Sequence, residues 1–179
     1  MSAVQFHSRS VVIGATRPPI SVVGRDSALI AGVMVHHTAS PVHVGTNAHS
    51  YAKSLYDWCV RPTSQGGRGY GDIEYHAMIT QDGQILDCRP SSARGAHCRA
   101  PLPGFAHSAN TTHLGVAFIM NASQTIPSYL ALEALHVYRY LAHLYTGRPL
   151  ALAWHSQANP TACPGTRLAP ILASLPSKV

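Results

Sequence analysis

Charged side chains are scarce in this chain of 179 residues, making up only 11% of it, whereas apolar residues make up 46%. This balance excludes a disordered polar chain and predicts a globular protein. Lysine is almost missing, because Lys53 and Lys178 are the only two, so the formal net charge of +6 comes almost wholly from arginine. The arginines stand singly, with no basic run interleaved with aromatic residues, so nucleic acid is not expected as a partner. The pI near 9.4 instead favours a membrane surface or a bacterial wall polymer.

Long hydrophobic runs are missing as well. The longest apolar stretch, LIAGVMV from residue 29 to residue 35, is far too short to cross a bilayer. The N-terminal stretch MSAVQFHSRSVVIGATRPP lacks the apolar segment of a secretory signal peptide. We therefore expect a protein that is made in the cytoplasm, that does not insert stably into a membrane, and that needs another agent for any export.

The four cysteines, Cys59, Cys88, Cys98 and Cys163, contain no CxxC pair, which argues against a zinc ribbon or a thioredoxin-like motif. Cys88 and Cys98 could form a disulfide, but free thiols are the expected state. The chain shows no internal repeat and no linker, and its length suits one ordinary domain with a sizeable core. We therefore predict a single domain, with an N-terminal arm at 1–25 packed on a body at 26–179.

Hydrophobic periodicity and turn residues predict alternating strands and helices. Short, partly β-branched apolar runs indicate buried strands, and Asp82-Gly83 between two strand-like runs indicates a hairpin. The expected elements are a strand at 30–38, a helix around 51–59 after a turn near Gly45, a loop at 61–72, a hairpin of 73–79 with 84–88, a strand at 114–120, a helix at 127–145 ended by Gly147 and Pro149, a loop, and a short helix after Pro164. This order predicts an α/β fold with a mixed central β-sheet flanked by helices.

Two histidine-containing segments are candidates for a functional site. His36 and His37 end a buried strand, which is where α/β sheets place ligands, and successive strand residues face opposite ways, so only one of the pair can enter a given site. In LAWHSQANPTACPG, His155 and Cys163 stand eight residues apart in a segment broken by two prolines. The pair could be half of a metal site, a cysteine nucleophile with its base, or two unrelated buried side chains. Two imidazoles and one thiolate form a set that suits zinc and leaves a fourth position for water.

Tyr75 lies near the start of the expected hairpin. Its hydroxyl could donate a hydrogen bond to a developing oxyanion beside a metal, or it could belong to a half-buried strand tyrosine, and spacing alone leaves both open. Strand alternation predicts that Glu74 and Tyr75 face opposite ways, with a structural His76 on the side of Glu74.

Four motifs in order resemble the type 2 N-acetylmuramoyl-L-alanine amidases, the group that includes phage lysozyme-amidases and peptidoglycan recognition proteins. The motifs are VMVHHTAS, DIEYHAMITQDGQI, RGAHC followed by LGVAFIMN, and WHSQANPTACPG, and they span residues from about 30 to 170. The resemblance implies that residues 26–179 form a zinc amidase catalytic domain with its Zn²⁺ site at one edge of the sheet. It assigns the zinc ligands to His36, His155 and Cys163.

The resemblance also implies roles around the metal. Tyr75 matches the catalytic tyrosine of the family, and Thr161 takes the position two before the ligand cysteine, where it would assist catalysis. His97 of the GAH motif and Asn110 are candidates for substrate contact. His37, directly behind the first ligand, joins this substrate-side group as a residue that packs against or supports the site.

The function implied is zinc-dependent hydrolysis of the amide between N-acetylmuramic acid and L-alanine in peptidoglycan. The natural setting is a phage or prophage endolysin, a bacteriolytic and antimicrobial enzyme that is made in the host cytoplasm and acts at the periplasm or cell wall, and a monomer is expected. A bacterial recycling or lysis enzyme stays open. Two other functions also remain: a peptidoglycan-binding module without catalysis, and a cysteine peptidase in which Cys163 is the nucleophile and His36 or His155 the base.

Overall fold

A six-stranded sheet, in the order β1-β4-β3-β5-β2-β6, organises the chain. The structure is a computed structural model that describes residues 3–14 and 22–178. The strands are β1 (Gln5–His7), β2 (Gly32–His37), β3 (Ala77–Ile79), β4 (Gln84–Asp87), β5 (His113–Phe118) and β6 (Ala151–Trp154). Only the β3–β4 pair is antiparallel among these neighbours. The predicted mixed sheet of an α/β fold is therefore confirmed.

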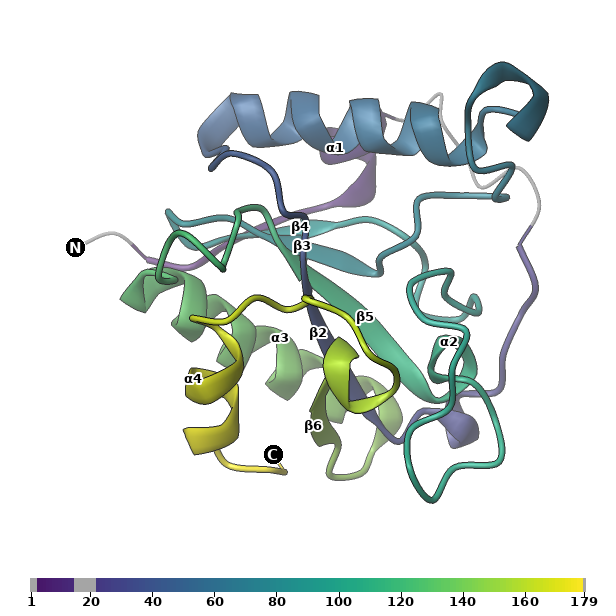
Figure 1. The fold of residues 1–179 in the computed structure, drawn as a ribbon, viewed down its shortest axis with the longest axis vertical. Helices are drawn as coiled ribbons and strands as arrows, with labels where there is room; N and C mark the ends of the chain where they lie inside the picture. The colour runs from purple at the N-terminus through teal and green to yellow at the C-terminus, as the bar shows by residue number, and fades with distance from the viewer. Residues whose placement is uncertain (1–2, 15–21, 179) are drawn as a thin grey trace.

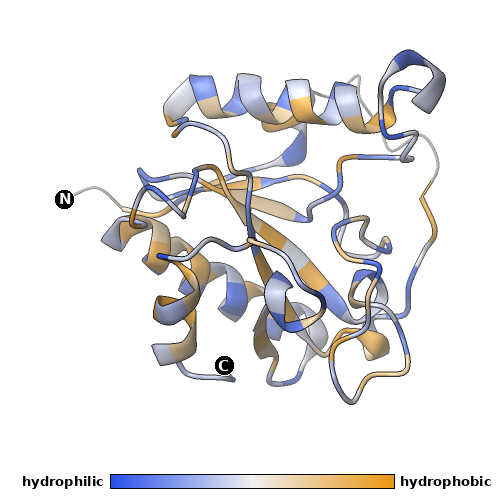
Figure 2. Cartoon of the chain, viewed as in Figure 1, coloured by the Kyte–Doolittle hydropathy of each residue, from blue (hydrophilic) through white to orange (hydrophobic). Residues whose placement is uncertain are grey.

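Helices cover both faces of the sheet (Figure 1). The helix α1 (Gly45–Val60) lies on one face, and α3 (Tyr129–Thr146) and α4 (Ala169–Ser174) lie on the other. Strand alternation divides the core in the same way: Val33 and Val35 belong to the cluster that includes α3, whereas Met78 and Ala117 belong to the cluster that includes α1. In Figure 2 the hydrophobic colour follows the central strands β2 and β5 between these layers.

The long helix α3 has the ends that its sequence predicts. The Ser128 side chain accepts a hydrogen bond of 3.0 Å from the Ala131 N–H and caps the first turn. At the other end, Gly147 takes a left-handed conformation with φ of 69° and donates to the His143 carbonyl at 2.8 Å. The other helical elements of the described residues are a short helix, α2 (Ala109–Thr112), three 3-10 turns at Ser27–Leu29, Thr63–Gln65 and His155–Gln157, and a π-helical turn at Ser10–Gly14.

The predicted hairpin forms between β3 and β4, with Gly83 in its turn at a φ of 84°. Its first strand is shorter than expected, because it begins at Ala77 rather than at residue 73. Glu74, Tyr75 and His76 therefore precede the strand in irregular backbone. The alternation expected for Glu74 and Tyr75 does not apply to them.

The expected loop after α3 is wrong in part, because Ala151–Trp154 form β6, which pairs in parallel with β2. At the opposite edge of the sheet, β1 pairs in parallel with β4, and the π-helical turn Ser10–Gly14 buries Val12 and Ile13 in the cluster that includes α1. Residues 1–2 and 15–21 of the expected arm, and residue 179, lie outside the described part of the chain.

The four cysteines are free, as expected. None of the helices in the described part of the chain is long and apolar enough to cross a membrane.

Candidate metal site and its groove

His36 and His155 meet because they follow paired positions of two neighbouring parallel strands. Val35 in β2 is opposite Trp154, the last residue of β6, and His36 and His155 are the next residues along the chain. Their ring centroids lie 4.6 Å apart. The loop after β6 returns Cys163 to the same point, where its Sγ lies 3.6 Å from Nδ1 of His36. The ligand atoms of the three residues all lie within 4.8 Å of one another.

This donor set fits a zinc ion. A tetrahedral zinc with ordinary bond lengths holds a thiolate sulfur and an imidazole nitrogen about 3.6 Å apart, which matches the separation of 3.6 Å between Cys163 and His36. Burial, together with the neighbouring His97 and His155, holds the pKa of His36 well below its ordinary value, so its ring is neutral and offers a lone pair. Burial also raises the pKa of the Cys163 thiol to about 11, so zinc binding at neutral pH must displace its proton.

His97 lies behind the first ligand. Its Nδ1 is 3.0 Å from Nε2 of His36, and its own Nε2 is 3.3 Å from the backbone carbonyl oxygen of His113. The residue is buried, and burial lowers its pKa to about 3. His97 is part of the wall of the groove, but both of its ring nitrogens contact protein atoms.

The two other residues expected on the substrate side have protein partners of their own. Nδ1 of His37 accepts a hydrogen bond of 3.0 Å from the Ala122 N–H, and its side chain does not join the cluster of His36. The Asn110 amide oxygen accepts from the Cys98 N–H at 2.7 Å. Asn110 is buried and lies outside the set of groove residues, whereas His37 is among them.

A groove runs past the cluster in two connected hollows, of about 640 Å³ over His155 and Cys163 and about 520 Å³ along α1. Arg68, Glu74 and Tyr75 line both hollows and join them. The hollow along α1 is further lined by Tyr51, Leu55 and Trp58, among others. The Arg68 guanidinium lies over the Trp58 ring, 4.5 Å from its centroid, which is a cation–π distance. The groove thus combines aromatic surface with a positive charge next to the cluster.

Tyr75 stands beside the cluster, with its ring centroid 5.3 Å from that of His36. Glu74 faces the same groove, and its carboxylate accepts a hydrogen bond from the Tyr75 hydroxyl, so the expectation that the two face opposite ways is wrong. Burial raises the pKa of Glu74, and burial and the Glu74 charge raise the pKa of Tyr75 well above its ordinary value. Sequence reasoning missed Glu74 as a groove residue because it took residues 73–79 as a strand.

Thr161 lies in the loop before the third ligand. Its Oγ1 accepts a hydrogen bond of 3.2 Å from the Cys163 N–H, and the residue is exposed in the wall of the groove. Asn159, in the same loop, hydrogen-bonds the His155 ring. The structure therefore brings together His36, His155, Cys163, Tyr75, Thr161, His97 and His37 around one groove, and leaves Asn110 behind it.

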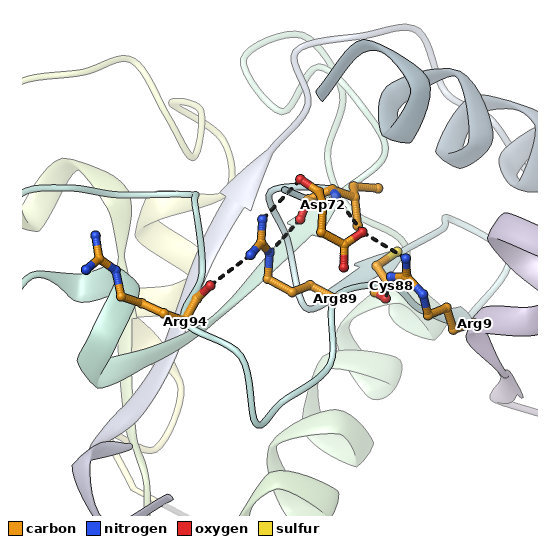
Figure 3. Close-up of polar contacts among 6 residues, drawn as sticks. Arg9, Asp72, Cys88, Arg89 and Arg94 are labelled. Carbon is orange, nitrogen blue, oxygen red and sulfur yellow. Dashed lines mark hydrogen bonds and ion pairs between the residues drawn. The ribbon is translucent and has the colours of Figure 1, made fainter. Parts of the chain in front are cut away.

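Two arginine side chains hydrogen-bond the residues that precede Glu74 and Tyr75 (Figure 3). The Arg89 side chain donates to the carbonyl oxygens of Ile73 at 2.7 Å, Asp72 at 3.0 Å and Arg94 at 2.9 Å. Arg9 donates to the Asp72 carboxylate at 2.8 Å and also to the Cys88 carbonyl. The Arg9 and Arg89 side chains thereby fix the irregular backbone at Asp72 and Ile73, next to the site.

Comparisons with known proteins give relatives over most of the chain. Peptidoglycan-recognition protein SD of Drosophila melanogaster is 27% identical over 165 residues, which cover 90% of this chain and 81% of that protein. Human N-acetylmuramoyl-L-alanine amidase is 29% identical over 145 residues, which cover 79% of this chain but only 23% of that protein. The solved structure of wild-type Drosophila peptidoglycan recognition protein LB superposes with a TM-score of 0.80 at 24% identity, covering 98% of this chain and 96% of the other.

The family model described as N-acetylmuramoyl-L-alanine amidase matches residues 26–166, which include the His–His–Cys cluster and Tyr75. The chain therefore belongs to the N-acetylmuramoyl-L-alanine amidase family.

Proposed function

We propose that this protein is a zinc-dependent amidase that cleaves the bond between N-acetylmuramic acid and L-alanine of the peptidoglycan stem peptide. The observation that carries the proposal is the complete set of His36, His155 and Cys163 with Tyr75 beside it: His155 and Cys163 line the groove, and His36 is buried next to them. His36, His155 and Cys163 are proposed as the metal ligands. The family assignment supports the reaction, and the donor set supports the metal.

Amide hydrolysis needs a nucleophile and a place for negative charge. His36, His155 and Cys163 would hold the zinc ion, which when bound would supply Lewis acidity to activate a water and polarise the scissile carbonyl. When substrate is bound, the single O–H of Tyr75 would turn from Glu74 to the developing oxyanion, and Thr161, which faces the same space, would orient the substrate. Glu74 lines the same hollow as His155 and Cys163, so we assign its carboxylate to receive the proton that the attacking water loses and to return it to the leaving amine.

The groove suits a peptide that carries carboxylates. Arg68 and Arg99 line its wall and provide positive charge for the stem peptide, while Tyr51 and Trp58 offer apolar surface along α1. Relatives with this fold support the substrate class, since a variant of peptidoglycan recognition protein LB was solved with tracheal cytotoxin, as was recognition protein LE, for which the ligand is described as monomeric diaminopimelic acid-type peptidoglycan. His37 and the buried Asn110 are proposed to support the substrate side from behind.

A phage or prophage endolysin is the setting we propose. The enzyme would be a bacteriolytic monomer, made in the host cytoplasm and acting at the periplasm or cell wall. The net charge of +6 supports attraction to anionic wall polymers.

A recognition module without catalysis is the second candidate, because relatives with this fold are named as recognition proteins. The presence of His36, His155 and Cys163 together with Tyr75 favours the enzyme. A cysteine peptidase is disfavoured on two grounds. Burial raises the pKa of Cys163 to about 11, so a free thiolate nucleophile is costly, and the helix that follows begins only at Ala169.

Digestion of purified peptidoglycan tests the proposal. New L-alanine amino termini and new reducing sugar ends are counted in zinc-loaded, chelated and zinc-restored protein. We expect amino termini alone, lost on chelation and restored by zinc. Binding to the pelleted wall without either product would show a recognition module, and product that persists after chelation but stops with iodoacetamide would show a thiol peptidase.

A further inference from the structure

We propose that His97 is a positioning residue that fixes the tautomer of His36, so that Nδ1 of His36 presents its lone pair to the metal. The inference rests on the proposed metal site. It replaces the expected role of His97 as a substrate contact with a role behind the ligand. A chain of three contacts carries it, from the His113 carbonyl through His97 and His36 to the Cys163 sulfur.

The chain of contacts has one consistent set of proton positions. A backbone carbonyl can only accept, so the Nε2 of His97, 3.3 Å from the His113 oxygen, carries the hydrogen. A neutral imidazole has a single N–H, so Nδ1 of His97 is an acceptor. Nε2 of His36, 3.0 Å away, must then donate to it. The remaining nitrogen of His36, Nδ1, is left without a hydrogen.

That bare nitrogen faces the third ligand. Nδ1 of His36 lies 3.6 Å from the Cys163 sulfur, where it can accept from the thiol until a cation displaces that proton. In the opposite tautomer, Nδ1 of His36 would carry a hydrogen that points into the space for the ion, and Nε2 would meet a second acceptor on His97. The arrangement therefore prepares one tautomer of His36 before any ion binds.

Two glycines hold the His97 ring in this orientation. A Cβ added to Gly115 in β5 would lie 2.3 Å from Cδ2 of His97, and one added to Gly95 would lie 2.5 Å from the same atom. The ring is buried in the space that these missing side chains leave. Since both ring nitrogens already have partners, His97 has no free polar atom to offer a substrate. Its buried position and its neighbours suit a support for His36.

The zinc affinities of two variants at His97 test the inference. His97→Leu removes the acceptor, and His97→Asn keeps an amide oxygen near the place of Nδ1. We expect His97→Leu to weaken zinc binding 10–100-fold, which is the usual effect of losing a hydrogen bond behind a ligand histidine, and His97→Asn to restore most of that loss. His49→Leu, a histidine on α1 whose ring contacts His7 rather than the cluster, is the matched control and should leave zinc affinity unchanged. Affinity is measured by competition with a chromophoric chelator, after thermal unfolding of each variant has shown a folded protein.

Long-range nitrogen–proton NMR of the zinc-free wild type gives a second readout that does not depend on any variant folding. We expect His36 in the single tautomer protonated on Nε2. A hydrogen on Nδ1, or unchanged zinc affinity in a folded His97→Leu, would overturn the inference. Tight zinc binding by a wild type that cleaves no amide would instead refute the proposed function and leave this inference intact.

Discussion

The guanidinium of Arg9 lies 2.8 Å from the carboxylate of Asp72, whose side chain is fully buried. Arg9 belongs to the N-terminal segment next to β1, and Asp72 heads the irregular segment that carries Glu74 and Tyr75. The ion pair therefore ties the N-terminal segment to the backbone of the groove (Figure 3). We propose that this contact keeps Tyr75 in register with the metal ligands.

Arg9→Met should destabilise the fold by about 3 kcal/mol, because it leaves the Asp72 carboxylate buried without its cation. Urea denaturation with zinc-free protein measures the change in the free energy of unfolding. Arg94→Met is the matched control, since the Arg94 side chain is exposed and contributes only its backbone carbonyl to the network. An equal effect of the two substitutions would show that the ion pair does not anchor the segment.

Tyr75→Phe should lower kcat by about a hundredfold or more, because it removes one hydrogen-bond donor from the transition state. Zinc affinity and pelleting with peptidoglycan should stay as in the wild type. Tyr129→Phe, at a tyrosine that is 77% exposed, should leave kcat unchanged. A Tyr75→Phe enzyme with wild-type kcat would remove the hydroxyl from the mechanism.

Glu74→Gln should lower kcat and remove the acid limb of the pH–rate profile, since the carboxylate must be ionised to accept a proton. Burial raises the pKa of Glu74, so that limb should lie above the ordinary glutamate value of 4.5. We would measure kcat as a function of pH for the wild type and for Glu74→Gln, both at saturating zinc.

The same pKa shift has a consequence for stability with a definite sign. A carboxyl whose pKa is raised by folding favours the folded state below its unfolded pKa, and that contribution is lost as the pH rises through the folded pKa. Zinc-free Glu74→Gln should therefore unfold at a higher temperature than the wild type at pH 7, with the difference vanishing near pH 4. A lower melting temperature for Glu74→Gln than for the wild type at pH 7 would contradict a buried Glu74 carboxyl with a raised pKa.

Zinc binding should release about one proton per ion at pH 7, because the pKa of Cys163 is raised to about 11 while the lowered pKa values of His36 and His155 leave both rings neutral. Calorimetric titrations in buffers of different ionisation enthalpy measure this number. Cys163→Ser should bind zinc far more weakly and release no proton from this position. Release of no proton by the wild type would mean that the thiol is not a ligand.

Sequence patterns predicted the elements whose signals are local. The helix α3 follows from its apolar stripe and from Gly147, and the hairpin follows from Asp82-Gly83. The resemblance singled out His36, His155 and Cys163 because motifs can be recognised from their order along the sequence, even though the three residues meet only in the folded chain. These predictions needed no knowledge of neighbouring strands.

The remainder depends on tertiary contacts that no local pattern encodes. The strand β6 has only Ala151–Trp154 and forms because β2 offers it a parallel edge. Glu74 enters the groove because arginine side chains, not strand pairing, hold the backbone before it. The contact of His97 with His36 joins residues 61 positions apart, so the GAH motif alone suggested a substrate contact instead.

Hydrolysis of purified peptidoglycan in water enriched in oxygen-18, followed by mass spectrometry of the products, tests the proposed reaction most directly. The amidase places one heavy oxygen in the lactyl carboxylate of the muramic acid product and leaves the L-alanine amino terminus of the peptide unlabelled. Label in a stem-peptide carboxylate would reveal a peptidase, label at a reducing sugar end would reveal a glycosidase, and either result would contradict the account.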